Sequence, residues 1–176
     1  MKVMRRGWWM TLAMGAILVG RGKAQALESP RDTTRAKIGG ANILVDYGRP
    51  SKRGRVIVAA DGLVPFGSVW RAGANAATTF VTDKPLMFGS TMVPAGTYTL
   101  YALPGAAGWK LIINKQTGQW GTEYHQDQDL ARVDMKVEKL PNVVEKFAIK
   151  VEPKGAMGVF RLEWDTTAAV TEFMVH

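Results

Sequence analysis

The sequence predicts an all-β domain, either an antiparallel β-sandwich or a jelly-roll-like fold. Short apolar runs recur along the chain, and in several of them apolar and charged residues alternate with a period of two, as in 134–138, 147–151 and 160–164. Turn residues such as Pro94, Ala95 and Gly96 separate these runs. Many short strands with one apolar face bury that face by packing two sheets together, so we expect a sandwich rather than an α/β fold.

The first element is an apolar segment, residues 7–20, which carries no charge and follows three basic residues. As a helix it spans about 21 Å, less than the ~30 Å of a bilayer core. Ala24-Gln25-Ala26 adds the small-x-small pattern at which signal peptidase cleaves. Residues 1–26 are therefore predicted to be a signal peptide or, if uncleaved, a signal anchor. We expect an exported, periplasmic protein that is anchored to the inner membrane if this segment is retained.

Residues 27–40 are polar and lack apolar periodicity, which predicts a linker or a first edge segment ahead of one domain at 41–176. In that domain, β-type runs bounded by turn residues predict about ten strands. These strands are expected near 41–47, 55–59, 77–82, 86–88, 96–103, 109–115, 130–139, 145–152, 157–164 and 168–175. The stretch 63–75 contains Pro65, Gly67 and Gly73, so we expect an ordered, partly buried loop there.

The composition excludes several classes of function. The chain has no cysteine, which rules out disulfides and thiolate metal sites, and its two histidines, His125 and His176, cannot build a multi-histidine centre. The net charge of +8 comes largely from residues 1–26, which hold five of the 23 basic residues and no acid. The remainder carries 18 basic residues against 15 acids, so a nucleic-acid-binding face is not indicated. No cofactor is expected.

Four sequence blocks stand out for their glycine, proline and tryptophan content. They are residues 47–55 (YGRPSKRGR), 63–75 (LVPFGSVWRAGAN), 94–98 (PAGTY) and Trp120-Gly121. In this order they resemble the bacterial domain-of-unknown-function family 2911, over a range from about Ser29 to the C-terminus. The resemblance implies an exported, β-rich single-domain protein without an assigned reaction. Ala76 stands where members usually carry an acidic residue, so charge-dependent chemistry of the family is not implied for this chain.

Arginines provide the first group of candidate binding residues. Arg49, Arg53 and Arg55 lie close together in the sequence, and Arg71 and Arg132 lie in two other regions. Converging guanidinium groups bind a carboxylate or phosphate through paired hydrogen bonds. The simpler interpretations are that Arg53 and Arg55 are solvated, and that Arg71 pairs with an acid such as Asp129 to hold a loop to the sheet.

The other candidates are polar and aromatic residues. Asn75 closes the 63–75 block, and Trp120 lies in a glycine-flanked turn where it is either core or an exposed platform for a partner or sugar. If extended, His125, Asp127 and Asp129 share one face, but a flat row of ligands about 6–7 Å apart does not converge on a metal ion. They are weak metal candidates, and we predict no metal site.

Three functions remain open from the sequence. The absence of a Gly-x-Ser-x-Gly elbow, of paired carboxylates and of a phosphate-binding glycine loop favours a protein without catalytic activity. The leading hypothesis is an extracytoplasmic interaction module, tethered through residues 7–20, that acts as an accessory subunit of an inner-membrane complex, respiratory or photosynthetic. The second is a soluble periplasmic domain that binds a small anion or glycan. The third is a hydrolase that uses His125.

Overall fold

The computed structural model describes residues 29–176, so the predictions for residues 1–26 lie outside the described residues. The described chain consists of strands and a single 3₁₀ turn at Gln126–Gln128. The strands are β1 (Arg31–Ile38), β2 (Ala41–Gly48), β3 (Thr78–Thr82), β4 (Leu86–Phe88), β5 (Thr91–Val93), β6 (Gly96–Leu103), β7 (Trp109–Asn114), β8 (Asp129–Lys154) and β9 (Met157–Val175). The predicted all-β class is confirmed.

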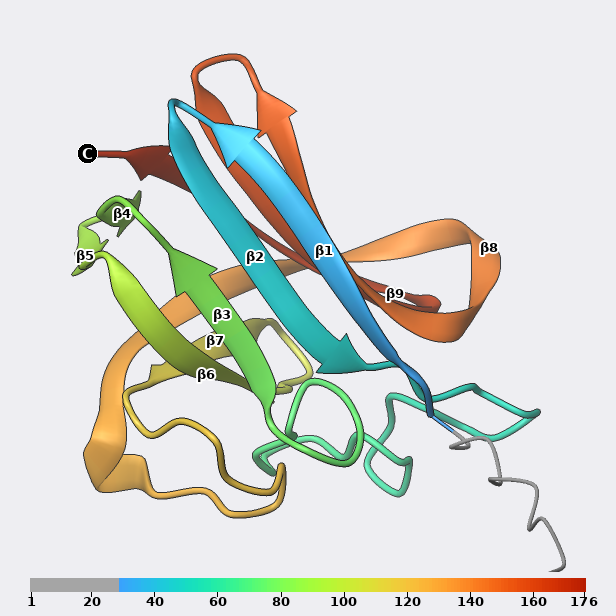
Figure 1. The fold of residues 1–176 in the computed structure, drawn as a ribbon. Coiled ribbons are helices and arrows are strands. Elements are labelled where there is room, and N and C mark those ends of the chain that lie inside the picture. The colour runs from blue at the N-terminus through green and yellow to red at the C-terminus, as the bar shows by residue number, and fades with distance from the viewer. Residues whose placement is uncertain (1–28) are drawn as a thin grey trace, which may run out of the picture.

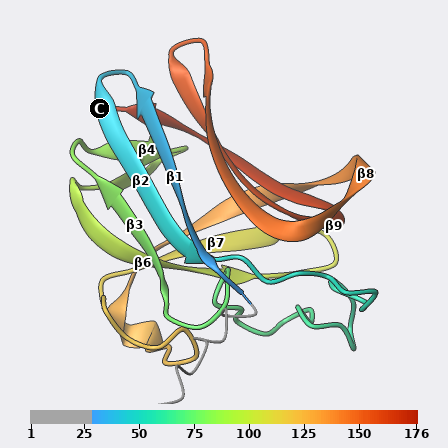
Figure 2. The same cartoon turned by 45° about the vertical axis from the view of Figure 1, so that its right-hand side comes forward.

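One antiparallel sheet in the order β1-β2-β3-β6-β7-β8-β9-β4-β5 contains all nine strands of the described region. The sheet folds over on itself: β1, β2, β3 and β6 form one layer, and the long β8–β9 pair crosses behind it (Figures 1 and 2). The core lies between these layers, where Phe80 of β3 meets Phe160 of β9 edge to face at 6.2 Å. The architecture is therefore sandwich-like although its strands belong to one sheet.

Two pairs of predicted strands are each one long strand. The runs at 130–139 and 145–152 are both part of β8, and those at 157–164 and 168–175 are both part of β9. The pairing of β8 with β9 shifts register between Lys139 and Val144 and again between Val144 and Ala148. Such bulges bend a strand and interrupt its alternation, which is why the sequence pattern predicts two short strands in place of one.

Two further strand predictions need correction. Residues 55–59 form no strand, because this irregular segment contributes only an isolated bridge between Val58 and Val64, although Ile57 is buried. The short strand β5 is not among the predicted strands.

The segment predicted as a linker or edge segment is an edge strand. β1 pairs with β2 along its whole length, up to the pair formed by Ile38 and Ala41. The two residues between them, Gly39 and Gly40, have positive φ angles of 55° and 80°. This is the two-residue hairpin turn that glycine pairs favour, so the Gly-Gly pair was the signal for a hairpin at this position.

Side chains of the first two strands, and of Arg49 directly after them, close an edge of β8 that has no strand beside it. The hydroxyl of Thr34 donates to the carbonyl of Ile149 at 2.6 Å, and the N–H of Ile149 donates to the Tyr47 hydroxyl at 3.0 Å. The Arg49 Nε donates to the carbonyl of Phe147 at 2.9 Å. These contacts satisfy buried backbone groups of β8 and fix the end of β2 against it.

Candidate functional site

Three of the four sequence blocks meet just beyond the end of β2, and glycines make the approach possible. A Cβ on Gly48 would collide with the carbonyl oxygen of Ala74, and one on Gly73 would lie 2.8 Å from the Thr78 Oγ1. A Cβ on Gly121 would lie 2.7 Å from both the Asn75 carbonyl oxygen and the Arg71 Cδ. None of these three glycines has a positive φ. Each is therefore required because a Cβ would not fit at its position, and not because of its backbone conformation.

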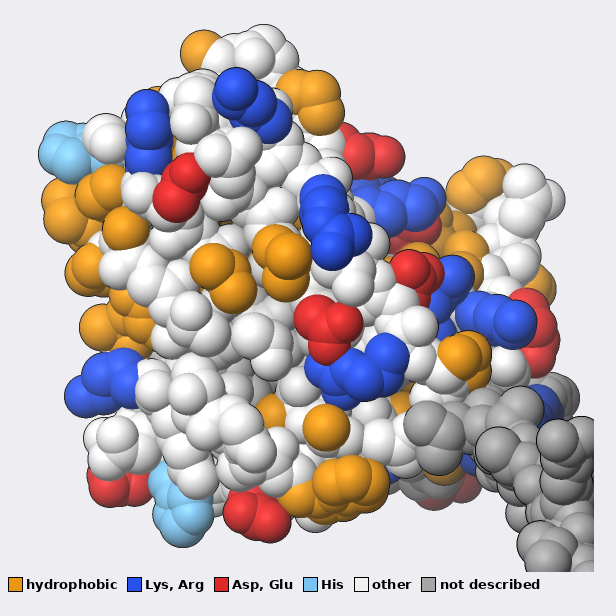
Figure 3. Space-filling view, in the orientation of Figure 1, with side chains coloured by type: hydrophobic (Ala, Val, Ile, Leu, Met, Phe, Trp, Pro, Cys, Tyr) orange, Lys and Arg blue, Asp and Glu red, His pale blue; other side chains and the backbone are white. Residues whose placement is uncertain are grey.

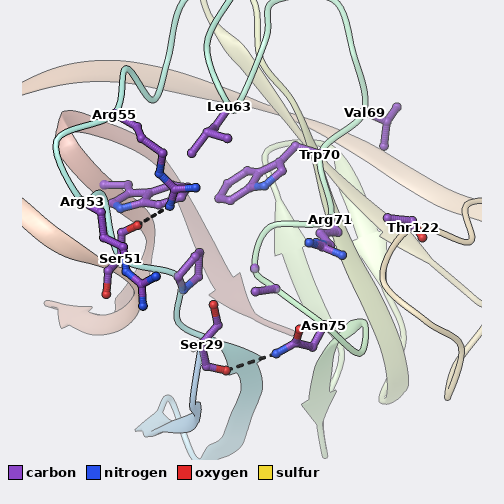
Figure 4. Close-up of a pocket in the computed structure, with 14 residues that line it drawn as sticks. Ser29, Ser51, Arg53, Arg55, Leu63, Val69, Trp70, Arg71, Asn75 and Thr122 are labelled. Carbon is purple, nitrogen blue, oxygen red and sulfur yellow. Dashed lines mark hydrogen bonds between the residues drawn. The ribbon is translucent and has the colours of Figure 1, made fainter. Parts of the chain in front are cut away.

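A pocket with a volume of about 680 Å³ lies at this junction. Three arginines and no acidic residue are among the residues that line it. The lining consists of Ser29, Pro50, Ser51, Arg53, Arg55, Leu63, Val69, Trp70, Arg71, Gly73, Ala74, Asn75, Thr122 and Trp164. Figure 4 shows Arg53 and Arg55 on one side of the pocket and Arg71 with Asn75 on the other, with the Trp70 ring between the two sides.

The segment after β2 holds Arg55 in a defined position. Its Nη2 donates to the carbonyl of Ser51 at 2.7 Å and its Nε to the carbonyl of Lys52 at 3.0 Å. The segment itself is attached to β8 and β9, because Lys52 pairs with Asp165 at 3.1 Å and the Arg53 N–H donates to the Glu145 carboxylate at 2.8 Å. Arg55 is thus preorganised at the rim of the pocket while part of its guanidinium stays available.

Arg71 differs from Arg55 in its hydrogen bonding. Within residues 29–176, no hydrogen bond or ion pair joins its guanidinium to another group, although the side chain is only partly exposed. The expected pairing of Arg71 with Asp129 is not formed, because Asp129 binds Arg132, Tyr124 and the Asn114 amide instead. A guanidinium in a pocket without a carboxylate partner is suited to bind an anion from solution.

Backbone strain is concentrated around the same pocket. Four residues other than glycine have positive φ in the described region: Arg53 at 50°, Ala72 at 44°, Asn75 at 63° and Asp165 at 55°. Arg53 and Asn75 line the pocket, and the other two are each adjacent in sequence to lining residues. This conformation costs of order 1–3 kcal/mol for Arg53 and Ala72 and less for asparagine and aspartate, and strained residues of this kind often lie at binding and catalytic sites.

The apolar wall of the pocket is built from tryptophan. The Trp70 ring stacks on Trp164 with a centroid distance of 5.9 Å and contacts Phe147 edge to face at 4.8 Å. Trp164 and Trp109 are each 5% exposed, as expected for core residues. Trp70 was not among the predicted binding residues, and its place directly before Arg71 was the available signal.

The remaining predicted site residues lie elsewhere. Arg49 pairs with Asp32 at 2.8 Å and supports β8, so its role is structural. Arg132 belongs to a cluster in which it binds Asp129 at 2.9 Å and the Tyr124 hydroxyl at 2.8 Å. Trp120 is 50% exposed and does not line the pocket, although the adjacent Gly121 packs against the lining residues Arg71 and Asn75.

The three weak metal candidates do not converge. His125 and Asp127 are exposed, and the carboxylate of Asp129 is occupied by its arginine, tyrosine and asparagine partners. Among residues 29–176, no group of three or more His, Asp and Glu side chains could hold a metal ion.

Burial and then the hydrogen bond to Asp129 raise the pKa of the Tyr124 phenol to about 12. That phenol therefore stays protonated at neutral pH and supports the cluster as a hydrogen-bond donor.

Comparison with known proteins finds a family model that covers all the sequence blocks that form the site. The model of a family described as a protein of unknown function (DUF2911) matches residues 29–173, which include every pocket residue. No curated protein and no solved structure matches the chain. In the part of the chain that the structure describes, no helix has the length and apolar character needed to cross a bilayer.

Proposed function

Since the chain belongs to the DUF2911 family of proteins of unknown function, and the whole pocket lies within the matched range, we propose that this domain is a non-catalytic binding module for a small anionic ligand. The observation that carries the proposal is the lining of the pocket, with Arg53, Arg55 and Arg71 and no acidic side chain. Such a set attracts carboxylate or phosphate groups and repels cations.

The apolar half of the pocket defines the rest of the ligand. Trp70 lies between the two groups of arginines, and Leu63 and Val69 are 44% and 37% exposed at the rim (Figure 4). An aromatic or sugar ring carrying the anionic group would cover this surface while its charge meets the guanidinium groups. A phosphorylated or carboxylated ring compound therefore fits better than a bare inorganic ion.

Arg71 is the residue whose substitution tests the proposal. Inorganic phosphate and phenyl phosphate serve as probes, and isothermal titration calorimetry together with tryptophan fluorescence measures their dissociation constants. A hydrogen bond to a charged group contributes about 1.5–3 kcal/mol, so Arg71→Gln should weaken phenyl phosphate binding by about ten- to a hundredfold. Phenyl phosphate should also bind more tightly than phosphate, because only the former contacts Trp70.

Arg35→Gln is the matched control, since Arg35 lies on β1 outside the pocket and its loss changes the net charge equally. We expect this variant to bind both probes as the unchanged protein does. Equal weakening in the two variants would mean that net charge, and not the pocket, attracts the anion. Dissociation constants weaker than about 1 mM for both probes would contradict the proposed function.

Export and attachment to a membrane complex stay predictions. They depend on residues 1–26, which lie outside the described residues. A hydrolase that uses His125 is likewise only a prediction, and within residues 29–176 the His125 imidazole makes no hydrogen bond to a neighbouring side chain.

A further inference from the structure

Three methionines lie side by side on three neighbouring strands, far in sequence from one another. Met87 of β4 stands opposite Met92 of β5 on one side and opposite Met174 of β9 on the other. Directly opposed residues of antiparallel strands project from the same face of a sheet. The three thioether side chains therefore form one row across β5, β4 and β9.

The row lies on the outer face of the sheet. Leu86 and Phe88, which flank Met87, are buried at 0% and 3% exposure, so Met87 projects the opposite way. Met92 and Met174 are 47% and 50% exposed. Figure 3 shows hydrophobic side chains gathered over β4 and β5 at the left edge of the molecule, with a histidine at the upper border of this patch.

His176 extends the row with an imidazole. Its backbone N–H donates to the carbonyl of Pro85 at 3.0 Å, which continues the β4–β9 pairing by one residue beyond Val175. Because it follows Met174 by two positions in an extended chain, it lies on the same face. The C-terminal end of the chain lies beside β4 in Figure 1. Three thioethers and one imidazole thus share a small exposed area.

This donor set is selective for a soft ion. Thioether sulfur binds Cu(I) in preference to hard cations, and imidazole is also a good copper ligand. Three of the five methionines in residues 29–176 belong to the row, while Met135 is buried and Met157 lies at the opposite end of β9. We propose that Met87, Met92 and Met174, with His176 as a fourth ligand, bind one Cu(I) ion.

The spacing of the strands permits one ion to reach all three sulfurs. The backbones of β5 and β9 are separated by two strand spacings, roughly 9–10 Å, with β4 between them. A methionine side chain has three rotatable bonds and adapts its position readily. Met92 and Met174 can therefore lean inward from either side to an ion placed above Met87, and no change in backbone is needed.

The test is a Cu(I) titration of the full chain in mild detergent without oxygen, in competition with the chromophoric chelator bicinchoninate. We expect one Cu(I) per chain. Loss of a supporting contact to a metal ligand weakens metal binding by about 10–100-fold, so loss of a ligand should cost at least about tenfold. Met87→Leu, Met92→Leu and Met174→Leu should each show that loss, and the triple variant should not compete with the chelator.

Leucine keeps the size and apolar character of the side chain, so the fold should be retained. Met157→Leu is the matched control and should bind Cu(I) like the unchanged protein. As a second measurement, Ag(I) used as a redox-inert substitute should shift the methyl NMR signals of Met87, Met92 and Met174 and leave those of Met135 and Met157 in place.

Two results would overturn the proposal. One is Cu(I) binding by the triple variant that equals that of the unchanged protein. The other is the absence of competition with bicinchoninate in the unchanged protein, in which case the row is an apolar surface only. Neither result bears on the arginine pocket, since none of the four residues lines it.

Discussion

Gly48→Ala tests whether the close contact between the end of β2 and the segment 71–75 creates the arginine pocket. The added Cβ would collide with the carbonyl oxygen of Ala74 and lie 2.9 Å from its carbonyl carbon. Carbon atoms pack at about 3.5–4.0 Å, so the contact with the carbonyl carbon alone requires the two backbones to separate by about 0.6–1.1 Å, and the closer carbonyl oxygen requires at least as much. No side chain can rotate away to relieve this contact, because the atoms it meets are backbone atoms.

The energetic cost follows from this displacement. Overpacking costs about 1–3 kcal/mol, and we expect the upper end here because the added Cβ meets only backbone atoms, while the lower entropy of alanine in the unfolded chain returns about 0.4–1 kcal/mol. We expect a net loss of about 2 kcal/mol in the free energy of unfolding. For a domain of this size each kcal/mol lowers the unfolding temperature by about 2–4 °C, so the variant should unfold about 4–8 °C lower. Because the segment carries Arg71 and Asn75, phenyl phosphate binding should weaken as well.

Thermal unfolding followed by circular dichroism measures the first effect, and calorimetric titration with phenyl phosphate measures the second. Gly108→Ala is the matched control: it has no positive φ, and its Cβ would make only an ordinary contact of 3.4 Å with the Met135 carbonyl oxygen. That variant should keep its stability and its binding. An unchanged or raised unfolding temperature for Gly48→Ala would refute the reasoning, because it would mean that this glycine is not needed for space.

Three further predictions concern polar groups. Burial raises the pKa of Glu163, but hydrogen bonds from its lysine and arginine partners outweigh this effect, so its pKa lies below 4.5. The stabilising contribution of the ionised Glu163 carboxylate is fully present above 4.5 and is lost as pH falls through the lowered pKa. Denaturant unfolding measured between about pH 7 and about pH 3 should therefore show a smaller loss of unfolding free energy in Glu163→Gln than in the unchanged protein. The pKa of Tyr124 is raised to about 12, so the contribution of its protonated phenol to the unfolding free energy is complete below pH 10.0 and is lost as pH rises through about 12. Tyr124→Phe should flatten this alkaline decline in the unfolding free energy, and an unchanged decline would argue against its bond to Asp129. Tyr47→Phe leaves the buried N–H of Ile149 without an acceptor and should cost about 1–3 kcal/mol in denaturant unfolding, whereas a cost near zero would show that this hydroxyl does not close the edge of β8.

The candidate site could be predicted only in part from the sequence. Arg53, Arg55, Arg71 and Asn75 were singled out from sequence blocks and do line one pocket. Arg49 has the same residue type and lies in the same block as Arg53, but it points to Phe147 and Asp32. Position in a block does not specify the direction of a side chain, since that depends on which distant strand packs against it.

The methionine row could not have been predicted from the sequence. Met87 and Met92 are five residues apart, and Met174 lies near the end of β9. Only the register that pairs Met87 with both of the others places the three sulfurs together. The charge count, in contrast, needs no structure, because it depends on composition alone.

The sequence by itself determined the all-β class, the exclusion of thiolate chemistry and many of the strand positions, since alternation with a period of two and turn residues act over a few neighbouring residues. The tertiary structure alone decided the continuity of β8 and β9, the folding of one sheet into two layers, and the convergence of three arginines on one pocket. These features depend on the pairing of residues that are tens of positions apart. Such pairing is set by the packing of the whole core, which no local pattern encodes.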